Sequence, residues 1–299
     1  MDRPHHPVLV AEVVALLAGK ALVIDATVGS GGHAEALLES GVGAVIGLDR
    51  DPEAIRESSV RLARFGSRFR GIRARFSQLD EVATRAGASP VGGVLYDLGV
   101  SSMQLDRAGR GFSYRSSGPL DMRMEQDTEA GPSAERVVNT YSEEDLARII
   151  FEHGEERFSR RIARAIVRAR SRLPISTTDE LVAIVAGAVP KRRGSPHPAR
   201  RTFQALRIEV NRELEELAAS LPQAASLLEP AGRMAAISYH SLEDRIVKRF
   251  LAGDQRLAVL TRKPLRPTED ERRANPRARS ARLRAAERIQ ERVHEEGVA

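Results

Sequence analysis

The chain has 299 residues, of which 41% are hydrophobic and 29% are charged, a composition typical of a soluble protein with one large domain or two ordinary ones. It has no apolar run long enough to span a membrane, no signal peptide and no cysteine, so we expect a cytoplasmic protein without disulfides or thiolate metal sites. The formal net charge of +6, carried mainly by arginine, suits a polyanionic partner such as nucleic acid.

Apolar, β-rich runs alternate with helical patterns in the first hundred residues. The predicted strands are residues 21–26, 44–49, 68–76 and 92–99, and the predicted helices between them are 32–40, 52–64 and 77–87. Asp51 and Pro52 supply the N-cap and first residue of the second helix. This alternation predicts a parallel, doubly wound sheet.

The alternation stops after residue 99. Residues 99–123 are rich in glycine and serine and predict a long loop, and helices follow it. Capping-box patterns at Ser142 and Thr177 mark two helix starts. One further apolar helix face repeats at three- and four-residue steps through Phe203, Leu206, Val210, Leu214 and Leu217.

A fifth strand is predicted within residues 228–241, and two short strands near 257–262 and 281–286. Connections between strands in such sheets are normally short, whereas the fourth and fifth strands are far apart in the sequence. We therefore expect a helical domain, residues 106–215, inserted into a sheet domain formed by residues 1–105 and 216–299.

Glycines follow the first predicted strand in the stretch LVIDATVGSGGHAEALLES, where the backbone can pass close to a ligand. A triphosphate loop needs Lys and Ser or Thr after the last glycine, but His33 and Ala34 stand there. Ala34 also weakens a dinucleotide fingerprint without excluding it. Asp25 would repel a pyrophosphate, and its spacing from the glycines resembles the first motif of methyltransferases that use S-adenosylmethionine.

Two further side chains follow strand ends. Asp49 ends the second strand, where a carboxylate can accept hydrogen bonds from both ribose hydroxyls of NAD or of S-adenosylmethionine. Asp51 is already available to cap the next helix, which favours the ribose role for Asp49. Phe76 follows the third strand and either stacks on adenine or packs in the core.

Six stretches together resemble the bacterial 16S ribosomal RNA cytosine N4-methyltransferase family, also called MraW. They are DATVGSGGHAEALL, GLDRDPEAI, DLGVSSMQLDRAGRGFSYRSSGPLDMRM, HPARRTFQALRIEVNREL, ISYHSLEDRIVKRF and NPRARSARLRAAER. The resemblance implies a Rossmann-like class I methyltransferase sheet with an inserted all-helical domain. It also implies methyl transfer from S-adenosylmethionine to N4 of one cytidine in the decoding centre of 16S rRNA, within the 30S subunit, without a metal.

The resemblance implies a set of cofactor-binding residues. They are Gly31, Gly32, His33, Asp49, Phe76, Asp97 and Gln104. His33 and Gln104 enter this set through the resemblance alone, whereas the glycines and Asp49 also follow from their positions after predicted strands.

Cytosine N4 is a poor nucleophile because its lone pair is delocalised into the ring, so an enzyme must accept hydrogen bonds from its amino protons and align it with the methyl group. Amino methyltransferases often carry Asp, Asn or Ser followed by Pro-Pro-aromatic after the fourth strand. Asp97 provides the acidic head here, but the prolines and the aromatic residue are missing. We predict catalytic roles for Asp97, Tyr239 and His240. Phe112, Tyr114 and Tyr239 are the candidates for stacking on the base.

Two basic regions are candidates for RNA contact. The first is residues 191–201, and we expect phosphate contacts from Lys191, Arg192, Arg193, Arg200 and Arg201. The second, residues 262–292, is equally compatible with a solvated surface. The oligomeric state stays open, a homodimer included. Methylation of DNA or protein, and an RNA-binding assembly factor without turnover, are the alternative functions.

Overall fold

The computed structural model describes residues 7–125, 131–190, 194 and 196–290, and its chain forms two compact units. The first unit combines the residues up to Gly99 with those from Glu215 onward, and the second unit is Val100–Leu214. The sequence placed these boundaries at 106 and 216. No helix in the described ranges is long and apolar enough to cross a membrane.

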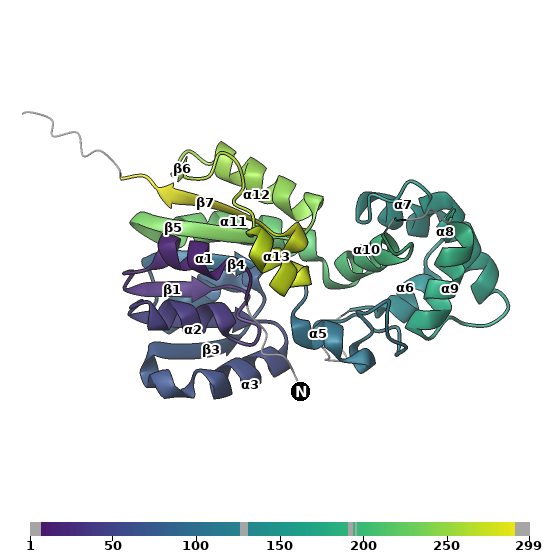
Figure 1. Cartoon of the computed structure of the whole chain (residues 1–299), viewed down its shortest axis with the longest axis horizontal. Coiled ribbons are helices and arrows are strands. Elements are labelled where there is room, and N and C mark those ends of the chain that lie inside the picture. The colour runs from purple at the N-terminus through teal and green to yellow at the C-terminus, as the bar shows by residue number, and fades with distance from the viewer. Residues whose placement is uncertain (1–6, 126–130, 191–193, 195, 291–299) are drawn as a thin grey trace, which may run out of the picture. The chain divides into compact units, whose positions relative to one another are not determined.

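A seven-stranded sheet forms the centre of the first unit in the described part of the chain (Figure 1). Its strands are β1 (Leu22–Asp25), β2 (Ala44–Asp49), β3 (Phe69–Arg73), β4 (Val91–Asp97), β5 (Leu228–Ser238), β6 (Leu257–Val259) and β7 (Arg282–Arg288). The order is β3-β2-β1-β4-β5-β7-β6; β1 to β5 are parallel, and β7 is antiparallel to both β5 and β6. This is the strand order of a Rossmann-like class I methyltransferase sheet, so the predicted fold class is confirmed.

Helices cover both faces of this sheet. They are α1 (Val10–Leu17), α2 (Gly32–Glu39), α3 (Pro52–Arg61), α4 (Leu79–Ala86), α11 (Glu213–Leu227), α12 (Ser241–Gly253) and α13 (Glu269–Ala274). Strand side chains alternate between two cores. Val23 and Leu95 pack with α1, α2 and α3, whereas Ile24 and Tyr96 pack with α4, α11 and α12. The predicted cap of α3 is confirmed, because the Asp51 carboxylate accepts a hydrogen bond from Glu53 N at 3.0 Å.

The described residues of the second unit form helices and loops, apart from an isolated bridge between Pro119 and Thr177. The helices are α5 (Ser102–Asp106), α6 (Ala134–Thr140), α7 (Glu143–Glu152), α8 (Ser159–Arg170), α9 (Thr178–Ala188) and α10 (Arg200–Asn211). Their apolar faces enclose one core. Both predicted helix starts are confirmed: Ser142 Oγ accepts from Asp145 N at 3.0 Å, and Glu180 accepts from Thr177 N at 3.0 Å.

Two sequence predictions are wrong in detail. Residues 99–123 are not loop throughout, because α5 begins there with a capping box in which Gln104 accepts from Ser101 N. The single helix face predicted from Phe203 to Leu217 is broken at Arg212, whose backbone is left-handed with φ 52° and ψ 39°. Phe203 consequently packs in the core of the second unit, whereas Leu217 packs in the core of the first.

The break after α10 is fixed by Asn211, which is 2% exposed. Its carboxamide accepts a hydrogen bond from Met124 N at 2.8 Å and donates one to Met122 O at 2.8 Å. The side chain is therefore committed to a neighbouring segment. The spacing of apolar residues gives no information on a polar contact of this kind, and it therefore predicted one continuous helix.

Candidate active site

Three aspartates end three neighbouring strands of the sheet: Asp25 ends β1, Asp49 ends β2 and Asp97 ends β4. In the strand register, Asp25 lies opposite Gly47 of β2 and Leu95 of β4. Asp49 and Asp97 therefore extend two residues beyond Asp25 on either side of it. This carboxyl edge is where open parallel sheets bind ligands, and β1 is the strand at which the chain order reverses.

The glycine loop between β1 and α2 has a left-handed backbone at Gly29, with φ 50°, and at Gly31, with φ 86°. A Cβ atom on Gly31 would lie 3.1 Å from Leu62 Cδ1, so the residue is also packed closely. Gly31 is the N-cap of α2, and no side chain caps the first turn. Uncapped N–H groups at a helix N-terminus favour an anionic group, such as a ligand carboxylate.

Asp49 is tied to the glycine loop. One carboxylate oxygen accepts a hydrogen bond from Gly29 N at 3.1 Å, and the other accepts from Asp51 N at 2.9 Å. Burial raises the pKa of Asp49 to about 7, against the lowering effect of these two backbone hydrogen bonds. Each oxygen keeps a second lone pair, so the fixed carboxylate can also accept from vicinal hydroxyls.

Asp97 is the meeting point of three elements. Tyr239, just after β5, donates its hydroxyl hydrogen to Asp97 Oδ1 at 2.7 Å. His33 of α2 places Nδ1 3.5 Å from Asp97 Oδ2. Burial raises the pKa of Asp97, while His33 and the Tyr239 hydroxyl act to lower it. The Asp97 side chain is 23% exposed, so part of it is open to a ligand.

The ring of Tyr239 lies beside the turn that follows β4. Gly99 has φ 94°, and a Cβ atom there would lie 3.3 Å from Tyr239 Cδ2. The chain thus turns beneath the Tyr239 ring directly after Asp97. The structure brings an aromatic ring beside Asp97 from β5 rather than from the sequence that follows β4.

His240 lies next to Tyr239 and caps α12. Its Nδ1 accepts from Glu243 N at 3.4 Å, and Glu243 accepts from Tyr239 N at 2.8 Å and from His240 N at 3.2 Å. These contacts show that His240 stabilises the start of α12. The catalytic role predicted for His240 stays a prediction.

The other predicted ligand residues are divided between the units. Phe76 follows β3, and its ring meets Tyr96 edge-on at 6.1 Å between centroids, so it packs on the core while staying partly exposed. Gln104 belongs to the second unit, where its Oε1 accepts from Ser101 N. The cofactor roles of both stay predictions.

Two candidate stacking residues also belong to the second unit. Phe112 is 5% exposed and packs in the core of that unit. Tyr114 stacks on His197 with ring centroids 4.8 Å apart and meets Phe203 edge-on. Phe112 is therefore a core residue. Tyr114 is already paired with another ring.

The predicted basic segment is described only in part. Lys191, Arg192 and Arg193 lie outside the described residues. Arg200 and Arg201 open α10 and are exposed, and Arg201 lies 3.6 Å from the buried carboxylate of Glu156. The phosphate contacts predicted for this segment stay predictions.

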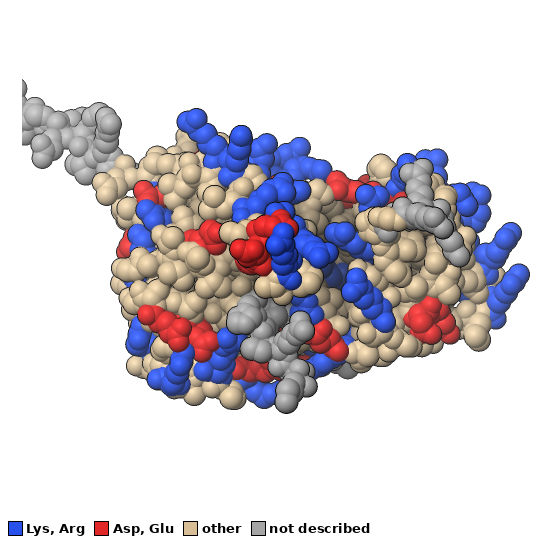
Figure 2. Space-filling view, viewed as in Figure 1, with Lys and Arg blue, Asp and Glu red and all other residues tan. Residues whose placement is uncertain are grey.

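Helix α8 has a face of arginines that are not among the predicted RNA-contacting residues. Its exposed arginines are Arg160, Arg161, Arg164 and Arg168, and Arg157 precedes them. Figure 2 shows Lys and Arg side chains projecting from the helical unit around α7, α8 and α9. The spacing of three and four residues opposite a buried Ile162 and Ile166 was available in the sequence as a signal.

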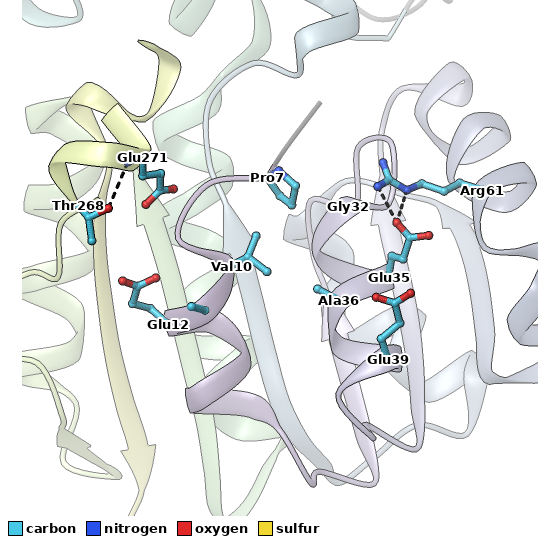
Figure 3. Close-up of a pocket in the computed structure, with 11 residues that line it drawn as sticks. Pro7, Val10, Glu12, Gly32, Glu35, Ala36, Glu39, Arg61, Thr268 and Glu271 are labelled. Atoms are coloured by element: carbon cyan, nitrogen blue, oxygen red, sulfur yellow. Dashed lines mark hydrogen bonds and ion pairs between the residues drawn. The ribbon is translucent and has the colours of Figure 1, made fainter. Parts of the chain in front are cut away.

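A pocket of about 490 Å³ opens beside α2, between that helix, α1 and α13 (Figure 3). Gly32 and Glu35 line it from α2, Glu12 from α1 and Glu271 from α13. Glu35 pairs with Arg61 at 2.6 Å, and Glu271 accepts from the backbone of Leu9 at 2.8 Å. The three strand-end aspartates do not line this pocket, although Gly32 in the first turn of α2 does.

The carboxyl-edge site has an excess of buried negative charge. Burial raises the pKa of Asp25 to about 6, with Asp97 adding to the effect and His33 opposing it. A ligand that offers a cationic group to the aspartates, a carboxylate to α2 and vicinal hydroxyls to Asp49 would match the three features of this site. The residues present therefore fit an amino-acid nucleoside that carries a positive charge.

Comparison with known proteins gives close relatives along almost the whole chain. Residues 2–289 match the MraW methylase family. Two relatives named ribosomal RNA small subunit methyltransferase H are each 52% identical over 95% of this chain. They come from Nitrobacter winogradskyi, with 90% of the relative covered, and Deinococcus deserti, with 93% covered. A solved structure of a putative methyltransferase from Streptococcus mutans is 12% identical, with a TM-score of 0.45 over 97% of this chain and 99% of that chain.

Proposed function

The chain belongs to the MraW methylase family, and from that membership we propose that it methylates N4 of a specific cytidine in 16S ribosomal RNA with S-adenosylmethionine as donor. The names of its relatives support methyl transfer to small-subunit rRNA. The motif resemblance extends the proposal to N4 as the acceptor atom and to cytidine 1402 in the usual bacterial numbering.

The observation that carries the proposal is the set of strand-end aspartates beside the uncapped start of α2. Asp49 would hold the ribose hydroxyls, and the first turn of α2 would hold the carboxylate. Asp25 and Asp97 would favour the cationic part of the cofactor. When bound, the cofactor supplies a methyl group attached to a sulfonium centre, and the rest of the cofactor leaves as a neutral thioether.

Asp97 is the residue that we assign to the substrate amino group. The Tyr239 hydroxyl holds Oδ1, and the partly exposed carboxylate can accept a hydrogen bond from N4. That hydrogen bond strengthens as the nitrogen becomes tetrahedral and more acidic, so it stabilises the transition state more than the ground state. Asp97 would also receive the proton that N4 loses.

The test is methylation of unmodified 30S subunits with labelled S-adenosylmethionine, followed by nucleoside analysis. We expect label on N4-methylcytidine at one position. Short unstructured oligonucleotides should be poor substrates, because a folded RNA is recognised by its shape and by a displaced base. Equal methylation of both would contradict a ribosomal target, and label only on DNA or protein would support the alternative substrates.

The arginine face of α8 should bind RNA phosphates. Replacing Arg160, Arg161 and Arg168 with Ala should weaken 30S binding, and the salt dependence of the affinity should fall by about 0.7 to 0.9 in logarithmic slope for each phosphate that the variant no longer binds. Cofactor affinity should stay unchanged. Binding measured at several salt concentrations checks this.

A matched control removes the same charge from the first unit, at Arg56, Arg64 and Arg85, which are exposed and paired with glutamates. This control should keep the wild-type slope. If the α8 variant also keeps it, the arginine face does not bind RNA. A lowered slope after replacing Lys191, Arg192 and Arg193 would then assign phosphate binding to that segment.

A further inference from the structure

The imidazole of His33 is held between a backbone carbonyl and a carboxylate. Its Nε2 lies 2.9 Å from Val8 O, and its Nδ1 lies 3.5 Å from Asp97 Oδ2. A carbonyl oxygen can only accept a hydrogen bond, so Nε2 must carry the hydrogen. The side chain is 5% exposed, and the ring is therefore fixed in this orientation by its surroundings.

This orientation decides what Nδ1 can do. In a neutral ring with hydrogen on Nε2, the lone pair of Nδ1 would face the ionised carboxylate of Asp97. A proton between the two atoms removes that repulsion and makes an ion pair. The Tyr239 hydroxyl already donates to Asp97 Oδ1, which favours the ionised carboxylate and leaves the proton on His33.

We propose that His33 is a positioning residue that acts through Asp97: as an imidazolium, it keeps the Asp97 carboxylate ionised and ready to accept the proton of the substrate amino group. The inference rests on the proposed function and deepens it. The family resemblance assigns His33 to the cofactor, whereas the contacts of its ring assign it to Asp97.

The surrounding charges make such a countercharge necessary. Burial and Glu243 of α12 both raise the pKa of Asp97, and Asp25 of β1 is coupled to Asp97 as a second buried carboxylate. Burial raises the pKa of the Tyr239 hydroxyl, and the negative charge of Glu271 in α13 adds to this effect. These groups are all acidic, so an uncompensated Asp97 would tend to hold a proton and could not accept another.

The proton balance of the reaction follows from this arrangement. N4 forms a bond to the methyl carbon while the carbon–sulfur bond breaks, with its electron pair passing to sulfur. N4 then holds one proton too many, and the Asp97 carboxylate accepts that proton. His33 keeps its own proton throughout and returns Asp97 to the ionised state when the proton leaves to solvent.

Single-turnover methylation of 30S subunits, at saturating S-adenosylmethionine and across pH, tests the role of His33. Two variants lack a titratable ring: His33→Asn retains a donor toward Asp97, and His33→Gln retains a donor toward Val8 O. In both, the acid limb of the rate profile should move to higher pH by about one unit, a tenfold loss on that limb, and the rate should recover at alkaline pH.

His153 offers a matched control, because its Nε2 lies 3.4 Å from Glu209 in the second unit. His153→Asn should leave the acid limb in place. An inactive wild type would contradict the proposed function. An active wild type whose acid limb matches that of the His33 variants would overturn the role of His33.

A second readout needs neither turnover nor cofactor. Nitrogen-15 spectra of the histidine rings in the free protein, with the His33 ring assigned through its own backbone resonances in the wild type, should show hydrogen on both ring nitrogens near neutral pH. In Asp97→Asn the Nδ1 hydrogen should be lost. A wild-type ring without hydrogen on Nδ1, or one unchanged by Asp97→Asn, would overturn the inference even if the two His33 variants failed to fold.

Discussion

Asp97→Asn should lower the single-turnover rate of methyl transfer by about 10²-fold at saturating cofactor and 30S subunits, the scale expected for removing one well-placed polar group. Asn keeps the shape and one acceptor oxygen but removes the charge that attracts the proton of N4. Because this interaction strengthens in the transition state, its loss should appear in kcat more than in cofactor affinity. Rapid-quench methylation with labelled cofactor measures the rate.

Asp254→Asn provides the comparison, because Asp254 is an acidic residue of the same unit that pairs with Arg256 at 2.6 Å. That variant should methylate at the wild-type rate. A near wild-type rate for Asp97→Asn, together with a raised cofactor dissociation constant, would leave Asp97 as a binding residue only. The loop of Ser238, Tyr239 and His240 would then be the next place to look for the proton acceptor.

Asp49→Ala should weaken S-adenosylmethionine binding by about 1.5–3 kcal/mol, which is the scale of hydrogen bonds to a charged group. The pKa of Asp49 is raised to about 7 by burial, so at lower pH its carboxylate is largely protonated and accepts hydrogen bonds less well. Wild-type affinity should therefore rise with pH through about 7. Calorimetric titration at several pH values checks both effects.

Asp49→Asn separates the charge from the shape. It should bind the cofactor with intermediate affinity and should lose the part of the pH dependence that belongs to Asp49. Unchanged affinity in Asp49→Ala would remove Asp49 from the site. Gly29 and Asp51 donate backbone hydrogen bonds to this carboxylate. Thermal unfolding of each free variant would show how much the loss of these hydrogen bonds destabilises the fold.

The central strands β1, β2 and β4 could be predicted from sequence because they are buried along most of their length and read as continuous apolar runs. The same reading located Asp49, since a residue at the end of a parallel strand reaches the ligand edge wherever that strand lies. Asp97 was predicted from the family resemblance and from the motif that amino methyltransferases carry after the fourth strand. Helix α1 was missed. It begins after Leu9, which has a left-handed backbone and no capping side chain, so the sequence there carries no helix-start signal.

The side-chain contacts within the site could not be predicted from the sequence. Tyr239 and Asp97 are separated by 142 positions, and His33 and Val8 by 25, so their contacts depend on how β5 and α1 are placed against β4 and α2. No local pattern records such distances. The sequence predicted Tyr239 as a catalytic and stacking candidate without showing that its hydroxyl donates a hydrogen bond to Asp97.

The buried strand-end aspartates also affect how the protein holds together before it binds its cofactor. Asp25 and Asp49 have folded-state pKa values of about 6 and 7, above the ordinary value of 3.8 that they regain on unfolding. Between these values the folded chain binds more protons than the unfolded chain, so its free energy of unfolding falls as pH rises. At neutral pH, the buried carboxylates of the binding site thus destabilise the folded, ligand-free chain. A cationic ligand that binds only the folded chain offsets this destabilisation, so cofactor binding raises the free energy of unfolding as well as supplying the methyl donor.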